Sequence, residues 1–512
     1  MAKVYAGPRL RRLREERGLR QAELARMLGI SPGYLNQMEH DSRPLTVPVL
    51  LRLTETFGVE PDFFSTRDTG RLLAELREAL ADELTDGRVT PSDLGELASR
   101  LPSVAQLLLE LGRRHHALAD RLAETATPTE RGAPVAAWAG AVPAEHAGPA
   151  VPAEHAVPAA DAERRGRAGP VGARGARTPG APHEEIREFF YRRRNYLHEV
   201  DLAAEKLAEE IGVRPGEVLR RLEARLVDRH GVRVLPHAGP EQHRYDPESR
   251  VLSVSGRLRP GQQAFRMATQ LALLEYDQGL SRLAGEDFPP GSDSWSLARI
   301  GVANYFAAAL ILPYRAFHTA AEEVRYDIER LADRFGLGYE TVCHRLSTLQ
   351  RPRLRGVPFS FVRVDRAGNM SKRQSATGFH FSHTGGTCPL WNVYEAFAAP
   401  GRIHVQIAAM PDGERYLWIA RTVTRRQGGW GDPAKSFAIG LGCEIPHAAR
   451  LVYSDGLDLG NAAVATPIGM GCRSCERLDC PQRAAPPAGV PLAVDEHSST
   501  FIPYPVRRRP GV

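Results

Sequence analysis

The feature that most constrains this chain of 512 residues is a long low-complexity segment. Residues 126–183 are rich in alanine, proline and glycine, and the hexapeptide VPAEHA occurs at position 142 and again at 151. A segment of this composition has too few large apolar side chains to bury a core, so we expect a disordered linker. The chain should therefore fold as separate domains on the two sides of the linker.

Composition and periodicity divide the rest of the chain. We expect a multidomain protein of the α plus α/β class, with an all-α helix-turn-helix domain at residues 1–66 and a helical connector at 67–125. Beyond the linker we expect a central α+β domain at 184–350, a C-terminal α+β sensor domain at 351–485 and an irregular tail at 486–512. Periodic apolar residues predict helices at Arg71–Leu84 and Val104–Leu122, and a hairpin near Arg244–Val254. Alternating residues predict strands at Phe359–Val364, Ile403–Ala408 and Tyr416–Thr424.

Charge and hydropathy bear on whether the chain binds nucleic acid, is secreted or spans a membrane. The net charge of +6 suits a nucleic-acid partner without proving one. The charged first residues, MAKVYAGPRLRRLREERG, do not have the pattern of a secretory signal. We find no run of 18 apolar residues, so we expect no membrane span and a cytoplasmic protein.

Residues 21–40, QAELARMLGISPGYLNQMEH, have the pattern of two short helices joined by a tight turn. Gly29 occupies the turn, where a positive φ is easiest without a Cβ atom. Ser31 can cap the second helix, and Pro32 fits its first turn. The apolar residues expected to form the bundle are Leu10, Leu13, Leu19, Leu24, Leu28, Ile30, Leu35, Met38, Leu50, Leu53 and Phe57.

The start of the second helix of such a motif enters the major groove of DNA. The residues this places near the bases are Ser31, Gly33, Tyr34, Asn36 and Gln37. Asparagine and glutamine can pair with both hydrogen-bonding groups of adenine. Candidate phosphate contacts, which position a protein without reading sequence, are Arg9, Arg12, Gln21 and Arg43. Over most of residues 7–64 the segment resembles XRE (Cro/C1-type) domains, which implies a double-stranded DNA operator as partner, and we expect a homodimer or higher homo-oligomer.

Cysteines are concentrated in the C-terminal third of the chain. Cys472, Cys475 and Cys480 follow a C-x2-C-x4-C pattern, and three thiolates leave one metal coordination position open. Cys388 is the preferred fourth ligand and Cys443 is its competitor. Four thiolates can hold either a structural zinc ion or an iron–sulfur cluster, and spacing does not choose between them.

The central domain resembles the ImmA/IrrE metallopeptidase-like domain over residues 241–315, including ANYFAAALILP at 303–313. Active members carry His-Glu-x-x-His on a helix, where two histidines bind zinc and the glutamate activates water. Here Thr269, Gln270 and Leu273 occupy those positions, and Val302 replaces a later glutamate. Because neutral glutamine is no general base and leucine is no ligand, we expect no peptidase activity and no enzyme. A zinc peptidase that cleaves a repressor is the rejected alternative.

A second helix-turn-helix pattern lies at Ile328–Leu346. We expect it to close the central domain rather than to bind DNA, and we expect Cys343 within it to be a packed core residue.

The C-terminal motifs are VDRAGNMSKRQSATGFHF, GGTCPLWNVYEAFAAPGRI, LVYSDGLDL and the cysteine cluster. Together with the preceding domains they resemble the short-chain fatty-acyl-CoA regulators. The resemblance implies a transcription regulator of propionate (methylcitrate) or acetate (glyoxylate) metabolism that senses a short-chain acyl-CoA. It also implies a [4Fe–4S] cluster in some members, on the motifs that contain Cys388, Cys472, Cys475 and Cys480. Since CoA carries phosphates, candidate ligand contacts are Lys372, Arg373, Arg421, Arg425 and Arg426.

Overall fold

The computed structural model describes two stretches of the chain. The first is residues 7–112, with gaps at 18, 41, 58–66, 81–88, 103 and 110. The second is residues 182–507, with gaps at 378, 380–386, 426–430, 432–433, 474 and 488–489. The expected linker lies outside these residues except for its last two positions, and Arg426 lies outside them as well.

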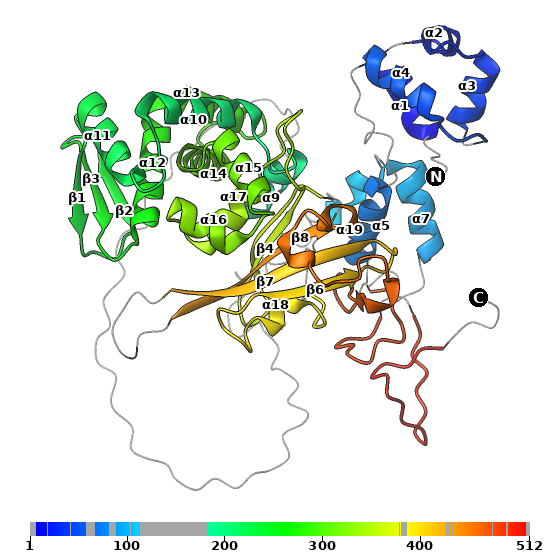
Figure 1. Ribbon diagram of the computed structural model, residues 1–512. Helices are drawn as coiled ribbons and strands as arrows, with labels where there is room; N and C mark the ends of the chain where they lie inside the picture. The colour runs from blue at the N-terminus through cyan, green and yellow to red at the C-terminus, as the bar shows by residue number, and fades with distance from the viewer. Residues whose placement is uncertain are drawn as a thin grey trace, which may run out of the picture. The chain divides into compact units, whose positions relative to one another are not determined.

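The N-terminal domain is a bundle of four helices (Figure 1). These are α1 (Gly7–Glu16), α2 (Gln21–Met27), α3 (Pro32–Glu39) and α4 (Val47–Phe57). The backbone amide of Tyr34 donates to the Ser31 hydroxyl at 3.1 Å, so Ser31 is the expected cap, and Gly29 has a φ of 61° at the turn. All the apolar residues proposed for the bundle lie in one cluster, which confirms the predicted motif.

The connector forms a second helical cluster. Its elements are α5 (Arg67–Ala79), α7 (Pro91–Arg100) and a further helical stretch at residues 104–109. Leu72, Leu76 and Leu94 pack with Ala105 and Leu109 in a small core. The sequence analysis missed α7, which begins with a Thr90–Asp93 capping box and Pro91 in its first turn.

The central domain is a layer of helices with a three-stranded sheet at one end (Figure 1). Its helices are α9 (Pro182–Arg192), α10 (His198–Ile211), α11 (Val218–His230), α12 (Pro260–Glu275), α13 (Asp277–Gly285), α14 (Asp293–Ile311), α15 (Tyr314–Glu323), α16 (Ile328–Phe335) and α17 (Tyr339–Leu346). Strands β2 (His243–Asp246) and β3 (Val251–Ser255) form the predicted hairpin, and β1 (Arg233–His237) pairs with β3 in parallel. Helix α14 is apolar on nearly all sides and contacts α9, α10, α12 and α13, so it forms the centre of the layer.

The C-terminal domain is built on a six-stranded sheet in the order β5-β4-β8-β7-β6-β9. The strands are β4 (Ser360–Val364), β5 (Met370–Ser375), β6 (His404–Ala409), β7 (Arg415–Arg425), β8 (Lys435–Glu444) and β9 (Thr466–Pro467). Two short helices, α18 (Asn392–Glu395) and α19 (Ile445–Ala448), accompany them. The pairs are antiparallel except β6–β9, and the three predicted strands correspond to β4, β6 and β7 within two residues.

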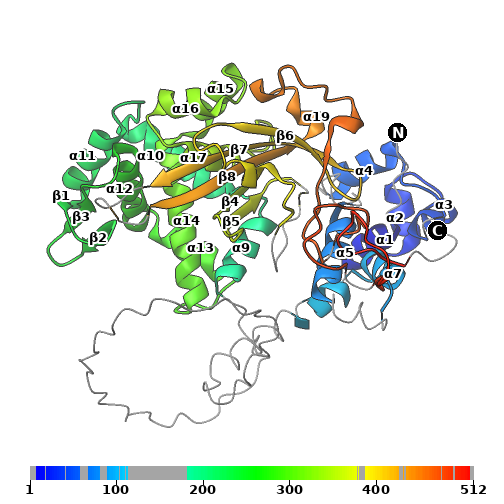
Figure 2. The same cartoon turned by 90° about the horizontal axis from the view of Figure 1, so that it is seen from below.

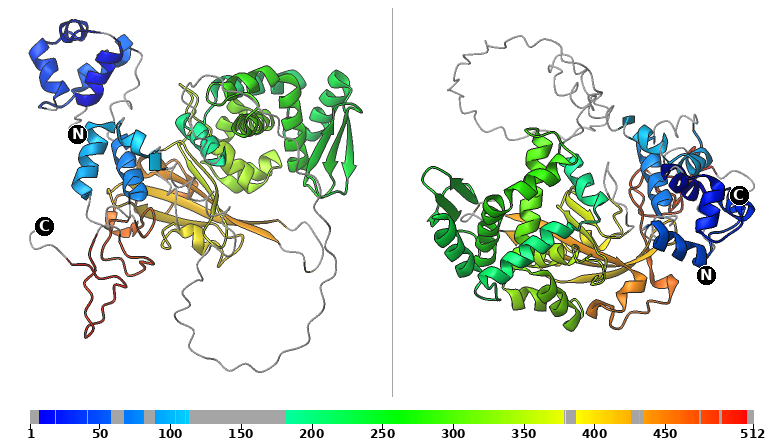
Figure 3. Two further views of the ribbon diagram at one scale, coloured as in Figure 1. Left: turned by 180° about the vertical axis from the view of Figure 1, so that it is seen from behind. Right: turned by 90° about the horizontal axis from the view of Figure 1, so that it is seen from above.

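The two faces of this sheet bury different cores. Leu417 and Ile419 of β7 join the large core of the central domain, whereas Trp418 between them faces a second cluster that contains Cys388. Gly442 of β8 leaves room for Trp418, because a Cβ atom there would lie 2.6 Å from the indole ring. Figures 2 and 3 show the green helices packed directly on the yellow and orange strands. The central helices and the sheet therefore share one core.

Helices α16 and α17 form the second helix-turn-helix pattern, with Gly336 at the turn at a φ of 65°. Tyr339, Val342, Cys343 and Leu346 of α17 are buried, and α17 contacts α14 and β8. This element closes the central domain, as expected, and Cys343 is a core residue.

No single helix among the described residues is both long enough and apolar enough to cross a membrane. The pair α14 and α15 passes that test only when both are taken together across a 63° bend.

Candidate functional site

The predicted DNA-reading residues lie on one exposed surface of the N-terminal domain. Ser31, Gly33, Asn36 and Gln37 are exposed at or near the start of α3, and Tyr34 is half-buried. Arg43 is exposed, and its guanidinium lies 5.2 Å from the centre of the Tyr34 ring. Their exposure on and beside α3 leaves them accessible, and their contacts with DNA stay a prediction.

The remaining candidate phosphate contacts of this domain differ in exposure and in hydrogen bonding. Gln21 donates to the Asn36 side-chain oxygen at 3.1 Å and to the Glu39 carboxylate at 3.0 Å. Glu39 is buried and also accepts from Arg14 at 2.7 Å. Gln21 therefore orients Asn36, a role that the sequence analysis missed. Arg9 is half-buried on α1, and the side chain of Arg12 lies outside the described residues.

The metallopeptidase-like helix has no metal-binding side chains in the relevant positions. On α12, Thr269 and Gln270 are buried, and the Thr269 hydroxyl donates to the Phe265 carbonyl oxygen at 2.9 Å. The same hydroxyl lies 3.4 Å from the side-chain oxygen of Asn304 on α14. Val302 is fully buried in the core. Short polar and apolar side chains thus replace the two histidines and the acids of an active site.

A cavity of about 500 Å3 lies beside this helix, between the central helices and the β4–β5 edge of the sheet. Helices α9, α12 and α14 give it an apolar wall that includes Phe190, Phe265, Leu297 and Ile300, and Leu258 before α12 adds to it. Asn304 also lines it, so the cavity adjoins the lost metal site. The volume is within the range usual for sites that bind small molecules and cofactors.

The lining of the cavity is also strongly basic. Six cationic side chains line it, against the single carboxylate of Glu340: Arg187, Arg266, Arg363, Lys372, Arg373 and Arg425. Glu340 pairs with Arg363 at 2.9 Å and Arg425 at 2.5 Å. Glu184 of α9 contacts Arg187 and lies 2.8 Å from Arg373. Two carboxylates thus face six cations, an excess that favours an anionic ligand.

Burial shifts the pKa of two groups in this wall. Burial is the main cause that lowers the pKa of Lys372 to about 8; the nearby Glu340 opposes this shift, and Arg363 and Arg425 add to it. Burial also lowers the pKa of His344 well below its ordinary value, with Lys372 and Arg345 adding to the effect. Both groups resist a positive charge mainly because they are buried, and the neighbouring cations add to the effect.

Three of the five candidate ligand contacts lie at this cavity, and one of them is Arg425 at the end of β7. Lys372 and Arg373 on β5 line it. Arg421 on β7 does not, and its guanidinium pairs instead with Glu329 of α16 at 2.8 Å. The sequence analysis missed Arg187, Arg266 and Arg363, since they are far apart in the chain and no motif marks them.

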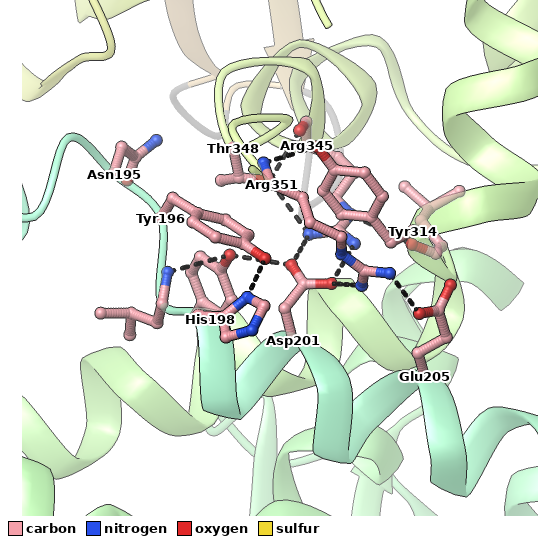
Figure 4. A network of polar contacts seen from close by, with 12 residues as sticks. Asn195, Tyr196, His198, Asp201, Glu205, Tyr314, Arg345, Thr348 and Arg351 are labelled. Atoms are coloured by element: carbon pink, nitrogen blue, oxygen red, sulfur yellow. Dashed lines mark hydrogen bonds and ion pairs between the residues drawn. The ribbon is translucent and has the colours of Figure 1, made fainter. Parts of the chain in front are cut away.

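A buried ion-pair network lies behind the cavity (Figure 4). Asp201 on α10 accepts from Arg345 at 2.8 Å, from Arg351 at 3.2 Å and from Tyr305 at 2.8 Å. Glu205, one helical turn later, accepts from Arg351 at 2.7 Å. The network joins α10 to α14, which carries the cavity-lining Tyr305, and to the segment that leads into the sheet.

The four candidate cysteine ligands line a second cavity, of about 20 Å3. Cys388, Cys472, Cys475 and Cys480 all contribute to its wall, whereas Cys443 is buried in β8 on the other face of the sheet. A Cβ atom on Gly469 would lie 2.5 Å from the Cys475 sulfur, so this approach needs glycine.

The loop of this cavity is braced by one buried arginine. Arg483 donates to the Cys475 and Arg477 carbonyl oxygens at 2.8 and 2.9 Å and also contacts the Cys472 carbonyl. The Ala484 amide lies 3.3 Å from the Cys472 sulfur.

The thiols share a cavity but do not form a closed metal site. Within the described ranges, no group of three or more His, Cys, Asp or Glu side chains is arranged to hold a metal ion. Burial raises the pKa of Cys388 and of Cys475, so each thiol resists ionisation without a bound cation. Four thiols around one cavity have the donor chemistry of a thiolate-bound metal, and the ligand set stays a prediction.

Comparison with known protein families gives a match for three parts of the chain. Residues 10–64 match a helix-turn-helix family, and residues 227–347 match the IrrE N-terminal-like domain. Residues 348–504 match the C-terminal domain of the short-chain fatty acyl coenzyme A regulators.

Curated relatives match over nearly the whole chain. The HTH-type transcriptional regulator RamB of Mycobacterium tuberculosis is 51% identical over 99% of this chain and 100% of its own. The HTH-type transcriptional regulator PrpR of the same species is 44% identical, over 98% of this chain and 96% of its own. A propionyl-CoA carboxylase regulator of Cereibacter sphaeroides is 40% identical, over 98% and 99%.

A solved Mycobacterium tuberculosis transcriptional regulator superposes with a TM-score of 0.62 at 51% identity, covering 64% of this chain and 99% of that one. The relatives are named transcriptional regulators, which confirms that the chain is not an enzyme. The matched domains, the exposed recognition helix and the lost metal ligands agree, and the chain belongs to the short-chain fatty acyl coenzyme A regulators, a family of helix-turn-helix transcriptional regulators.

Proposed function

We propose that this regulator senses a short-chain acyl-CoA in the basic cavity between α9, α12, α14 and the β4–β5 edge. The observation that carries the proposal is the pairing of six cations with an apolar wall in one cavity. A CoA thioester needs both, since its phosphates require cations and its pantetheine and acyl parts require apolar contacts. Arg266 and Lys372 make no ion pair with a described carboxylate, so they are the best placed to bind phosphate.

The ligand would act on DNA binding in the cytoplasm. A chain with one DNA-binding domain and one acyl-CoA domain controls genes of the metabolism that makes or consumes its ligand. One relative, named as a propionyl-CoA carboxylase regulator, supports propionate metabolism, by the methylcitrate route in our proposal, and acetate metabolism by the glyoxylate route is the second candidate.

The test is calorimetric titration of the full-length protein with acetyl-CoA, propionyl-CoA and free CoA. Lys372→Gln and Arg266→Gln should each weaken binding about tenfold or more, because each removes a charge-assisted phosphate contact. Lys206→Gln, on the exposed side of α10, is the matched control and should bind as the unaltered chain does. Unchanged affinity in both cavity variants would exclude this cavity as the ligand site.

We further propose that Cys388, Cys472, Cys475 and Cys480 hold a [4Fe–4S] cluster, with structural zinc as the alternative. Their presence around one cavity, the buried Arg483 and the amide near the Cys472 sulfur support the proposal. A bound cluster would supply sensitivity to oxygen or redox state. Iron, sulfide and zinc analysis of anaerobically purified protein separates the two occupants.

A further inference from the structure

One face of helix α14 forms part of the apolar wall of the basic cavity. Leu297, Ile300 and Ala308 line the cavity from this face. Asn304 lines it as well and lies one helical turn from both Ile300 and Ala308, so these side chains share one side of the helix. A polar amide group is therefore set into an otherwise apolar surface.

The side-chain nitrogen of Asn304 has no hydrogen-bond partner in the part of the chain that the structure describes. The side-chain oxygen of Asn304 lies 3.4 Å from the hydroxyl of Thr269 on α12. That hydroxyl has a single proton, which it donates to the Phe265 carbonyl oxygen at 2.9 Å. The surroundings of Asn304 therefore leave both of its N–H groups available to a molecule in the cavity.

The other polar side chain that α14 contributes to the cavity, Tyr305, is already engaged. Its hydroxyl donates to the Asp201 carboxylate at 2.8 Å and accepts from the backbone amide of Leu197 at 3.2 Å. Tyr305 thus has no proton left to donate to a ligand. Among the described residues of α14 at the cavity, Asn304 alone offers N–H groups.

We infer that the Asn304 side chain donates a hydrogen bond to the thioester carbonyl oxygen of the acyl-CoA, an inference that rests on the acyl-CoA cavity proposed above. This carbonyl joins the acyl chain to the rest of the molecule, so an acyl chain that packs on the α14 face brings the oxygen to that face. An N–H group that a ligand covers without replacing its water partner costs free energy. The site therefore favours ligands that carry the carbonyl oxygen.

The contact gives the regulator a way to distinguish acyl-CoA from free CoA. The two molecules differ only in the acyl group, and a short acyl chain has few carbon atoms that can contact the apolar wall. A site that hydrogen-bonds its ligand also discriminates against an analogue that lacks the bonding group, because its own polar group is then left unpaired. Asn304 is on this argument a specificity-determining residue.

Calorimetric titration of the full-length protein with propionyl-CoA and S-propyl-CoA tests the inference, since this thioether lacks only the carbonyl oxygen. The unaltered chain should bind propionyl-CoA about tenfold more tightly, as expected for one hydrogen bond in an apolar site. Asn304→Leu and the nearly isosteric Asn304→Asp should both lose this preference, because neither has an N–H donor. Ser296→Leu, at an exposed position of the same helix outside the cavity, is the matched control and should keep it.

The outcomes separate this inference from the proposed function. If the unaltered chain binds neither ligand, the acyl-CoA proposal fails, and the inference fails with it. If it binds both equally, or if Asn304→Leu weakens propionyl-CoA, S-propyl-CoA and free CoA alike, the cavity remains the ligand site but Asn304 does not bind the thioester carbonyl.

Infrared spectroscopy gives a direct second measurement. Propionyl-CoA labelled with carbon-13 at the thioester carbonyl should show a lower carbonyl stretching frequency when bound to the unaltered chain than when bound to Asn304→Asp, because a donated hydrogen bond weakens the C=O bond. The Ser296→Leu variant should give the frequency of the unaltered chain. Equal frequencies in the unaltered chain and Asn304→Asp would overturn the inference.

Discussion

Asp201 and Arg345 form a two-pronged ion pair, with nitrogen–oxygen distances of 2.8 and 3.2 Å and both side chains fully buried. Burying two charges costs solvation free energy that only their mutual contacts offset. Arg345→Met should therefore lower the free energy of unfolding by about 3–5 kcal/mol, because it leaves Asp201 short of a partner. Urea unfolding measures this, and Glu199→Gln, which breaks the exposed pair with Arg282, should have little effect. The double variant Asp201→Leu, Arg345→Met should recover part of the loss.

Acyl-CoA binding should weaken as the pH rises through about 8. The cause is Lys372, whose pKa burial lowers to about 8, so that the ammonium is present below this pH and lost above it. An ammonium binds phosphate and a neutral amine does not, so affinity is highest on the acidic side of the step. Calorimetric titration between pH 7 and 9 measures it. Lys372→Arg should abolish the step, since a guanidinium stays charged throughout.

The space beside the apolar wall should limit the length of the acyl chain that the cavity accepts. Ala308 on α14 lines the cavity, and Ala308→Leu adds volume to that wall. The affinity for butyryl-CoA should then fall about tenfold, which is the usual effect of one or two methylenes that do not fit an apolar pocket. The affinity for acetyl-CoA should fall less. Free CoA has no acyl group and serves as the internal control. Equal losses for all three ligands would place the acyl group elsewhere.

In the N-terminal domain, a substitution at a base-reading residue and one at a phosphate-contacting residue should change DNA binding in different ways. Gln37→Ala should cost about 1–3 kcal/mol of discrimination at one base pair. Arg43→Ala should weaken binding to all sequences alike and flatten the dependence on salt. Competition assays with single-base operator variants at two salt concentrations distinguish the two effects. Binding that is unchanged in both variants would show that α3 is not the reading helix.

The cysteine cavity should lose its metal when its own thiols are replaced. Cys388→Ser and Cys480→Ser should each abolish the visible absorption of anaerobically purified protein. Cys443→Ala should retain it, since Cys443 is buried on the other face of the sheet. Retained absorption in Cys388→Ser would remove this residue from the ligand set.

The sequence predicted many helices and strands correctly, because turns, helix caps and alternating strands depend on residues that are close together in the chain. The turn at Gly29 and the cap at Ser31 depend on neighbouring residues, and the alternation in β7 records which face each side chain occupies. The predicted domain boundaries stay predictions, although the family matches follow the same order.

The cavity could not be predicted in the same way. Arg187, Arg266 and Arg363 come from α9, α12 and β4, and only the packing of the central helices on the sheet brings them together. Nothing local marks them, and Arg421 resembles them in sequence but pairs with Glu329. Cys388 was placed with the C-terminal cysteines by motif, and the structure brings it to their cavity wall without closing the geometry.

Helix α9 combines two features: its place in the sequence after the low-complexity segment and its place in the fold beside the cavity. It is the first described element after the low-complexity segment, which in the sequence separates it from the N-terminal domains. It also contacts β5 and supplies Ile186, Arg187 and Phe190 to the cavity, as Figure 2 shows for its place beside the sheet. One helix thus follows the low-complexity segment in the sequence and also forms part of the cavity wall, so a substitution in α9 changes both.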